Sequence, residues 1–117
     1  MKLYGIKNCD TVKKARKWLD EQGVEYHFHD FKKDGLSPEK LAEWEQALGW
    51  STLVNQRGTT WRKLPEDVRG NMTAQSAHQV MLDNPSIIKR PVVEWGQAAD
   101  QAVTVGFNAD EWAANLR

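Results

Sequence analysis

The chain contains a single cysteine, Cys9, and no long hydrophobic run among its 117 residues. A lone cysteine excludes a disulfide within the chain and a Cys-x-x-Cys dithiol, and it is typical of proteins in a reducing compartment. A membrane-spanning helix needs about 20 mainly apolar residues, and no signal-peptide pattern is evident. We therefore expect a cytoplasmic protein that has no membrane partner.

An excess of charge of one sign is also absent. Lys and Arg number 16, and Asp and Glu number 16, so the formal net charge is zero. A balanced surface does not favour nucleic acid as a partner. The length suits one core of ordinary size, and we expect a monomer with a single domain over residues 1–117.

Hydrophobic patterning at the N-terminus predicts two strands joined by a helix. Residues 2–6 are short and apolar-rich, whereas apolar residues recur at helical spacing over about 11–22. Asp10 or Thr11 would cap this helix. Residues 24–29 alternate apolar and polar side chains, which is typical of a half-buried strand. The first third of the chain is therefore a β-α-β unit.

The middle of the chain has helix signals only. A charged connection over 30–35 leads to an all-helical insert at about 37–84, in which Ser37 and Thr73 are N-caps. Strand signals return at 91–95 and 102–105, which are close enough in sequence to form an antiparallel pair.

A last helix completes the expected fold. Asn108 would cap it, with Trp112 and Leu116 on its apolar side. The order β-α-β, helical insert, β-β-α is that of an α/β protein with a thioredoxin-like mixed four-stranded sheet.

Cys9 falls where the first strand leads into the first helix. The free N–H groups and the positive dipole end at a helix start favour the thiolate over the thiol, and Lys7 adds a cation. The alternative is a cysteine that is a small core side chain. The polar neighbours Asn8 and Asp10 favour the reactive interpretation.

Arg90 and Pro91 open the third predicted strand. In a thioredoxin-like sheet this point lies beside the start of the first helix, so we expect Cys9 to be their neighbour. Arg90 has a permanent charge and a planar fork of donors, which suit a thiolate, an oxyanion or a carboxylate. By itself, Arg90 would be better explained as a solvated arginine before a turn.

The second predicted strand contains part of a possible metal site. His27 and His29 share one face of this strand and Asp30 follows, but the third and fourth ligands of a closed zinc site are missing. We therefore expect no metal.

Residues 4–11 and 87–93 together resemble the ArsC/Spx family, and the resemblance covers nearly the whole chain. Residues 35–36, 53–61 and 105–107 narrow it to the YffB branch of arsenate-reductase-like proteins. The resemblance implies a thioredoxin-like fold, Cys9 as nucleophile with Arg90 facing it, a cis Pro91, and glutathione as thiol co-substrate.

Several positions depart from the family pattern. Arsenate reductases of the family generally carry a histidine four residues before the cysteine and a serine three after it, where this chain has Gly5 and Val12. Of their arginine triad only Arg90 matches; the middle position falls on Asn55, with Arg57 two residues further on. Spx-type regulators usually have a Cys-x-x-Cys switch, whose second cysteine is replaced by Val12. Tight arsenate binding and a redox-switched regulator are therefore both disfavoured.

The single cysteine, its expected neighbour Arg90 and the family resemblance together predict a glutathione-dependent thiol reductase related to arsenate reductases, where glutathione is what the resemblance implies. Cys9 and Arg90 are the expected catalytic residues, and an external thiol, glutathione or glutaredoxin, would resolve the Cys9 adduct. The expected substrate is a small-molecule or protein thiol or disulfide. The residues expected to bind substrate or glutathione are Lys7, Asn8, Arg57, Arg90 and Pro91. The alternatives are a true arsenate reductase and an Spx-like, non-catalytic regulator that binds RNA polymerase.

Overall fold

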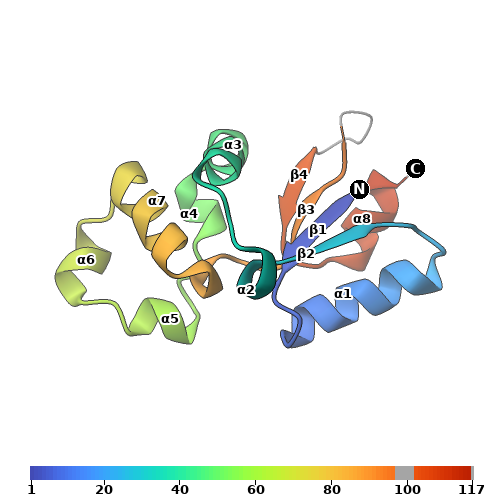
Figure 1. The fold of residues 1–117 in the computed structure, drawn as a ribbon, viewed down its shortest axis with the longest axis horizontal. Coiled ribbons are helices and arrows are strands. Elements are labelled where there is room, and N and C mark those ends of the chain that lie inside the picture. The colour runs from blue at the N-terminus through green and yellow to red at the C-terminus, as the bar shows by residue number, and fades with distance from the viewer. Residues whose placement is uncertain (97–101, 117) are drawn as a thin grey trace. The chain divides into compact units, whose positions relative to one another are not determined.

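The computed structural model describes residues 1–96 and 102–116. The chain divides into two compact units, the first formed by Met1–Gly35 with Arg90–Arg117 and the second by Leu36–Lys89. The sheet belongs to the first unit (Figure 1). The single domain with an insert at about 37–84 stays a prediction. In the described part of the chain, no helix has the length and apolar character needed to cross a bilayer.

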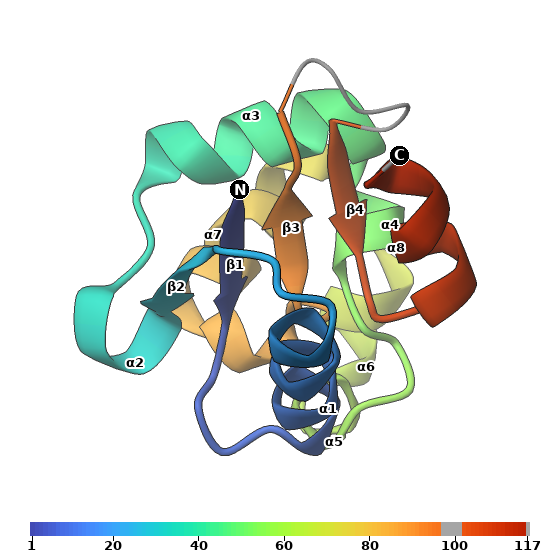
Figure 2. The same cartoon turned by 90° about the vertical axis from the view of Figure 1, so that its right-hand side faces the viewer.

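A mixed sheet of four strands forms the centre of the first unit, as the sequence predicts (Figure 2). The strands are β1 (Lys2–Gly5), β2 (His27–Asp30), β3 (Val92–Glu94) and β4 (Val103–Val105). Their order is β2-β1-β3-β4. β1 is parallel to β2 and antiparallel to β3, and β3 is antiparallel to β4. This is the thioredoxin-like arrangement.

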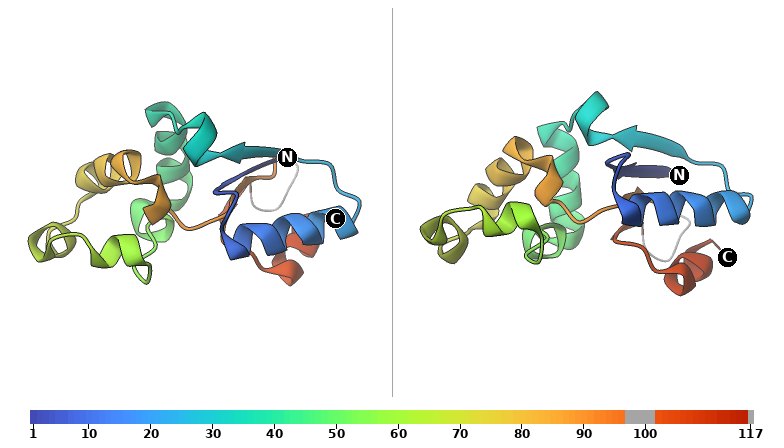
Figure 3. Two further views of the ribbon diagram at one scale, coloured as in Figure 1. Left: turned by 60° about the horizontal axis from the view of Figure 1, so that its bottom comes forward. Right: turned by 90° about the horizontal axis from the view of Figure 1, so that it is seen from below.

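Helices α1 (Asp10–Glu21) and α8 (Ala109–Asn115) lie on the same face of this sheet (Figures 2 and 3). Their buried side chains and those of β1 and β3 form one apolar cluster. Its members are Leu3, Val12, Ala15, Leu19, Val93 and Trp112. Burial of a Val, Leu or Phe side chain contributes about 1.5–3 kcal/mol. This cluster therefore fixes α1, and the residue that precedes it, against the sheet.

Trp112 anchors α8 through aromatic contacts. Its ring centroid lies 4.7 Å from that of Phe107, 5.1 Å from Trp95 and 6.0 Å from Trp18, each at a steep edge-on angle. Edge-to-face pairs of this kind add about 0.5–1.5 kcal/mol each beyond burial of their area. The tryptophans thus hold the C-terminal helix on the α1 side of the sheet.

The second unit is built from short helices. They are α3 (Pro38–Leu48), α4 (Trp50–Leu53), α5 (Thr59–Arg62), α6 (Glu66–Gly70), α7 (Ala74–Asp83) and the 3₁₀ helix η1 (Pro85–Ile87). Ser37 and Thr73 cap α3 and α7 as predicted. His78 Nδ1 lies 3.0 Å from both carboxylate oxygens of Glu45 and so links α7 to α3.

The second strand is shorter than expected at its start. β2 begins at His27 rather than at Val24. The Val24 amide donates to the Leu19 carbonyl (3.0 Å) and so still closes the preceding helix. β1 begins at Lys2, opposite His27, so the residues before His27 have no ladder partner. The alternation of apolar and polar residues over 24–29 therefore predicted which side chains are half-buried, but not the residue at which pairing with β1 begins.

Two further expectations were wrong. The charged connection contains a short helix, α2 (Phe31–Asp34), which begins because the Asp30 carboxylate accepts from the Lys32 amide (2.9 Å). Leu116 was placed on the apolar side of the last helix, but it follows α8 and is 40% exposed, while Trp112 is buried as predicted.

Candidate active site

Cys9 is itself the N-cap of α1, with φ −82° and ψ 127°. The prediction that Asp10 or Thr11 caps this helix was wrong, because Asp10 is already its first helical residue. Cys9 donates its amide to the Ile6 carbonyl (3.1 Å) and accepts from the Lys13 amide (2.9 Å) through its own carbonyl. Its side chain makes no capping hydrogen bond. Cys9 therefore lies at the start of a helix whose first-turn amides are not capped by a side chain.

The surroundings of Cys9 are apolar on one side and open on the other. Cys9 is half-buried and packs against the cluster formed by α1, α8 and the sheet. Lys7 and Asn8, which precede it, are exposed. This arrangement gives the thiol a fixed position and access to a partner in solvent.

Arg90 and Pro91 lie just before β3, at the end of the sheet where β1 ends and the chain continues to Cys9. Tyr4 of β1 pairs with Val92 of β3, so one further step of this antiparallel register sets Pro91 opposite Gly5. The Arg90–Pro91 peptide bond is cis, as the family resemblance implied. Pro91 is buried and Arg90 half-buried. The segment before α1 and the segment before β3 therefore lie at the same end of the paired strands β1 and β3.

Arg57 belongs to the second unit, on the loop between α4 and α5. Its amide donates to Asn55 Oδ1 (3.1 Å). It lines a cavity of about 430 Å³. The other lining residues are Ser51, Val54, Asn55, Gln56 and Lys89. A role for Arg57 in binding glutathione stays a prediction.

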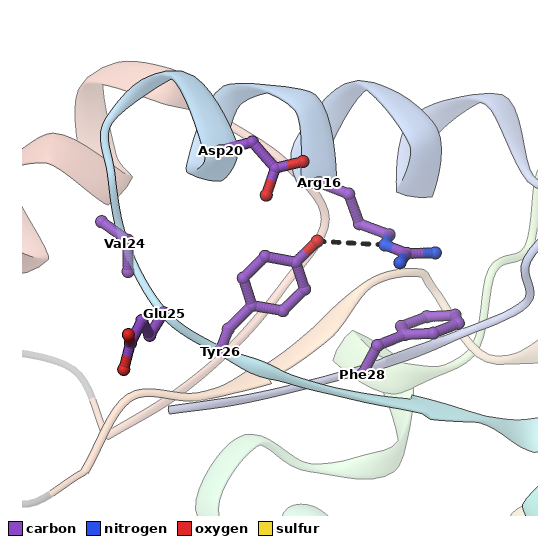
Figure 4. A pocket seen from close by; sticks show the side chains of 6 residues that line it. All are labelled: Arg16, Asp20, Val24, Glu25, Tyr26 and Phe28. Carbon is purple, nitrogen blue, oxygen red and sulfur yellow. Dashed lines mark hydrogen bonds between the residues drawn. The ribbon is translucent and has the colours of Figure 1, made fainter.

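Arg16 is a residue that sequence reasoning missed. Its Nε donates to the Tyr26 hydroxyl (3.0 Å), and its guanidinium carbon lies 4.3 Å from the centroid of the Phe28 ring (Figure 4). These residues line an open cavity of about 560 Å³ between α1 and the chain leading into β2. Arg16 follows Cys9 by about two helical turns and so lies on the same side of α1. That spacing was the signal in the sequence.

The two histidines of β2 differ in their surroundings. His29 Nε2 donates to the Gly35 carbonyl (2.6 Å), and its ring lies 4.9 Å from that of Tyr4, centroid to centroid. His27 is exposed. Within residues 1–96 and 102–116, no three His, Cys, Asp or Glu side chains gather as metal ligands would.

Comparison with known proteins connects this site to a family. A model of the ArsC family matches residues 4–115. The chain belongs to the ArsC family. The resemblance predicted from residues 4–11 and 87–93 is therefore confirmed, and the chain is an arsenate-reductase-related protein.

Similar proteins cover this ArsC-family chain almost completely. An uncharacterized protein of Haemophilus influenzae is 45% identical over 112 residues, which are 96% of this chain and 95% of that protein. A solved YffB protein is 48% identical with a TM-score of 0.91, covering 99% of this chain and 98% of that one. A solution structure of an arsenate reductase (ArsC) related protein from Brucella melitensis is 49% identical with a TM-score of 0.78, covering 99% and 93%.

A regulator also matches at lower identity. The global transcriptional regulator Spx of Staphylococcus epidermidis is 24% identical over 111 residues, which are 93% of this chain and 81% of Spx. The chain is therefore similar both to an arsenate reductase related protein and, at lower identity, to a protein whose name indicates a transcriptional regulator.

Proposed function

We propose that this ArsC-family protein is a glutathione-dependent thiol reductase with Cys9 as its nucleophile. The observation that carries the proposal is the position of Cys9 as N-cap of a 12-residue helix, half-buried and without a capping hydrogen bond. A thiolate at this position is stabilised by the helix dipole and the free first-turn amides. The protein would act in the cytoplasm, where thiols stay reduced.

The reaction proceeds by thiol–disulfide exchange. The Cys9 thiolate attacks one sulfur of a small-molecule or protein disulfide, a new S–S bond forms to Cys9, and the other sulfur leaves as a thiolate that takes a proton from water. A glutathione thiolate then attacks Cys9 Sγ and releases the second substrate thiol. A second glutathione, or glutaredoxin, attacks the glutathione sulfur and frees Cys9. Overall, one disulfide is reduced to two thiols while two thiols are oxidised to one disulfide.

An external thiol is required because the chain has no second cysteine. Arg90 would stabilise the Cys9 thiolate. Arg90 precedes β3 and Cys9 follows β1, and the two strands pair so that these segments lie at the same end of the sheet. The proposed binding residues for glutathione are Lys7, Asn8, Arg57, Arg90 and Pro91. The two exposed cations among them, Lys7 and Arg57, suit the carboxylates of glutathione.

The test is to incubate the reduced protein with oxidised glutathione and measure its intact mass. We expect one glutathionyl adduct on Cys9, which reduced glutathione or glutaredoxin removes. Cys9→Ser is the matched control and should gain no mass. A wild-type protein that forms no adduct, or an adduct that neither thiol removes, would contradict the proposal.

Two other functions remain to be compared with this one. True arsenate reduction is supported by the similarity to an arsenate reductase related protein, and glutathione-dependent release of arsenite would favour it. A non-catalytic regulator that binds RNA polymerase is supported by the similarity to Spx. Retention of purified RNA polymerase on the immobilised protein, without any disulfide reduction, would favour the regulator.

A further inference from the structure

A second cavity of the first unit begins at Lys7, two residues before Cys9. Its volume is about 230 Å³. It is lined by Lys7, Arg16, Phe28, Asp30, Lys33 and Asp34. Two residues of extended chain span at most about 7 Å, so one wall of this cavity starts close to the nucleophile.

The charges of the lining are not balanced. Three side chains are cationic and two are anionic, which leaves a net charge of +1. In the described ranges Lys7, Arg16 and Lys33 form no ion pair. The two carboxylates already accept from backbone amides: Asp30 Oδ1 from Lys32 (2.9 Å) and Asp34 Oδ2 from Asp30 (3.2 Å). These hydrogen bonds from neutral amides leave both carboxylate charges in place, so the net charge of the lining stays +1.

Arg16 is fixed in position before any ligand arrives. The Tyr26 hydroxyl accepts from its Nε, and the Phe28 ring lies beneath its guanidinium carbon (Figure 4). No other described residue accepts a hydrogen bond from Arg16, so its terminal N–H groups remain available. A guanidinium held in this way loses little conformational entropy when it binds a carboxylate.

We infer that this cavity binds the C-terminal carboxylate of a thiol peptide whose cysteine sulfur reacts with Cys9, namely the glycine end of glutathione. The inference deepens the proposed function and rests on it. A single carboxylate neutralises the net +1 charge, whereas the γ-glutamyl end carries an ammonium group as well and has no net charge. The glycine carboxylate also follows the cysteine of glutathione directly, which suits the short span from Cys9 to Lys7.

The test measures binding without chemistry, with S-methylglutathione and the full-length Cys9→Ser protein in calorimetric or NMR titrations. We expect the glycyl ethyl ester of this ligand to bind about tenfold more weakly, because a charge-assisted contact is lost. Lys33→Gln should weaken binding of the acid about threefold, as expected for an exposed ion pair, and leave binding of the ester unchanged. S-Methylcysteinylglycine, which lacks the γ-glutamyl group, should keep the Lys33 dependence.

Lys32→Gln is the matched control, because Lys32 is an exposed lysine of α2 that does not line the cavity. It should bind the acid and the ester as the parent protein does. Four results would each overturn the inference. The acid and the ester could bind equally, or Lys33→Gln could weaken both equally. The Lys33 dependence could vanish without the γ-glutamyl group, or S-methylglutathione could fail to bind. Failure of the proposed function is a separate result: wild-type protein that gains no glutathionyl mass, even where Lys33-dependent binding of the acid is found.

Discussion

Gly5 and Val12 pack so closely that a Cβ atom on Gly5 would lie 2.8 Å from Val12 Cγ2. Val12 is completely buried in the cluster that fixes α1 to the sheet. Arsenate reductases of the family generally have a histidine and a serine at these two positions. The two positions at which this chain departs from the family pattern are therefore in direct contact, and a side chain at position 5 would meet the valine at position 12.

Gly5→Ala should destabilise the protein by about 1–3 kcal/mol, since the added methyl group overfills a packed core. Urea denaturation measures the change in the free energy of unfolding. In a Val12→Ala background, the same Gly5→Ala change should cost less, because the clashing methyl group is gone. Gly70→Ala is the control, because no atom within 4 Å meets a Cβ there, and it should stay within about 0.5 kcal/mol. An equal cost of Gly5→Ala in both backgrounds would show that the two residues are not coupled.

Tyr4→Phe should destabilise the first unit by about 1 kcal/mol. The Tyr4 hydroxyl donates to Glu94 Oε1 at 2.7 Å across β1 and β3, and Tyr4 is only 4% exposed. Glu94→Gln keeps an acceptor oxygen and should cost less than Tyr4→Phe. Thermal or urea unfolding compares the two variants with wild type, and unchanged stability of Tyr4→Phe would contradict the prediction.

Arg90→Ala should slow the alkylation of Cys9 by iodoacetamide at neutral pH about fivefold. The proposed reason is the loss of a half-buried positive charge near the sulfur, and an effect of about 1 kcal/mol corresponds to this change in rate. Arg62→Ala removes an exposed arginine of the second unit and should leave the rate unchanged. If both variants react like wild type, Arg90 does not act on the sulfur.

Arsenate should be a poor substrate, with turnover at least a hundredfold below the median enzyme value of about 10 per second. Two arginines of the family triad are missing, and each lost charge-assisted contact costs about 1.5–3 kcal/mol. Arsenite formation with glutathione and glutaredoxin measures the rate, and Cys9→Ser defines the background. Turnover close to the median value would favour true arsenate reduction instead.

Local signals in the sequence predicted much of this fold. Ser37, Thr73 and Asn108 all cap helices where expected, because a side chain that bonds to a backbone amide three residues on needs no distant partner. The start of β2 was predicted too early, since it depends on where β1 begins, far away in sequence. Helix α2 was missed because four residues are too few to show a helical period.

The sequence predicted some residues of the candidate site and missed others. The sheet order implied by the elements placed Cys9 and Arg90 at one edge, and the β1–β3 register agrees. The cap was assigned to Asp10 or Thr11 because these types are better capping residues than cysteine, but the turn after β1 sets the helix start. Arg16 was missed because its role depends on contacts with Tyr26, which precedes β2, and with Phe28 of β2.

The central position of β1 has a consequence for synthesis on the ribosome. β1 pairs on one side with β2 soon after it is made, but on the other with β3, and Tyr4 and Glu94 are 90 residues apart. At about 5–20 residues per second, the nascent chain spends roughly 5–18 seconds with this strand edge open, which favours pairing with other chains. Cys9 is made early and Arg90 late. A ribosome that stalls before Arg90 therefore holds a chain with a free thiol, an open strand edge and no complete site.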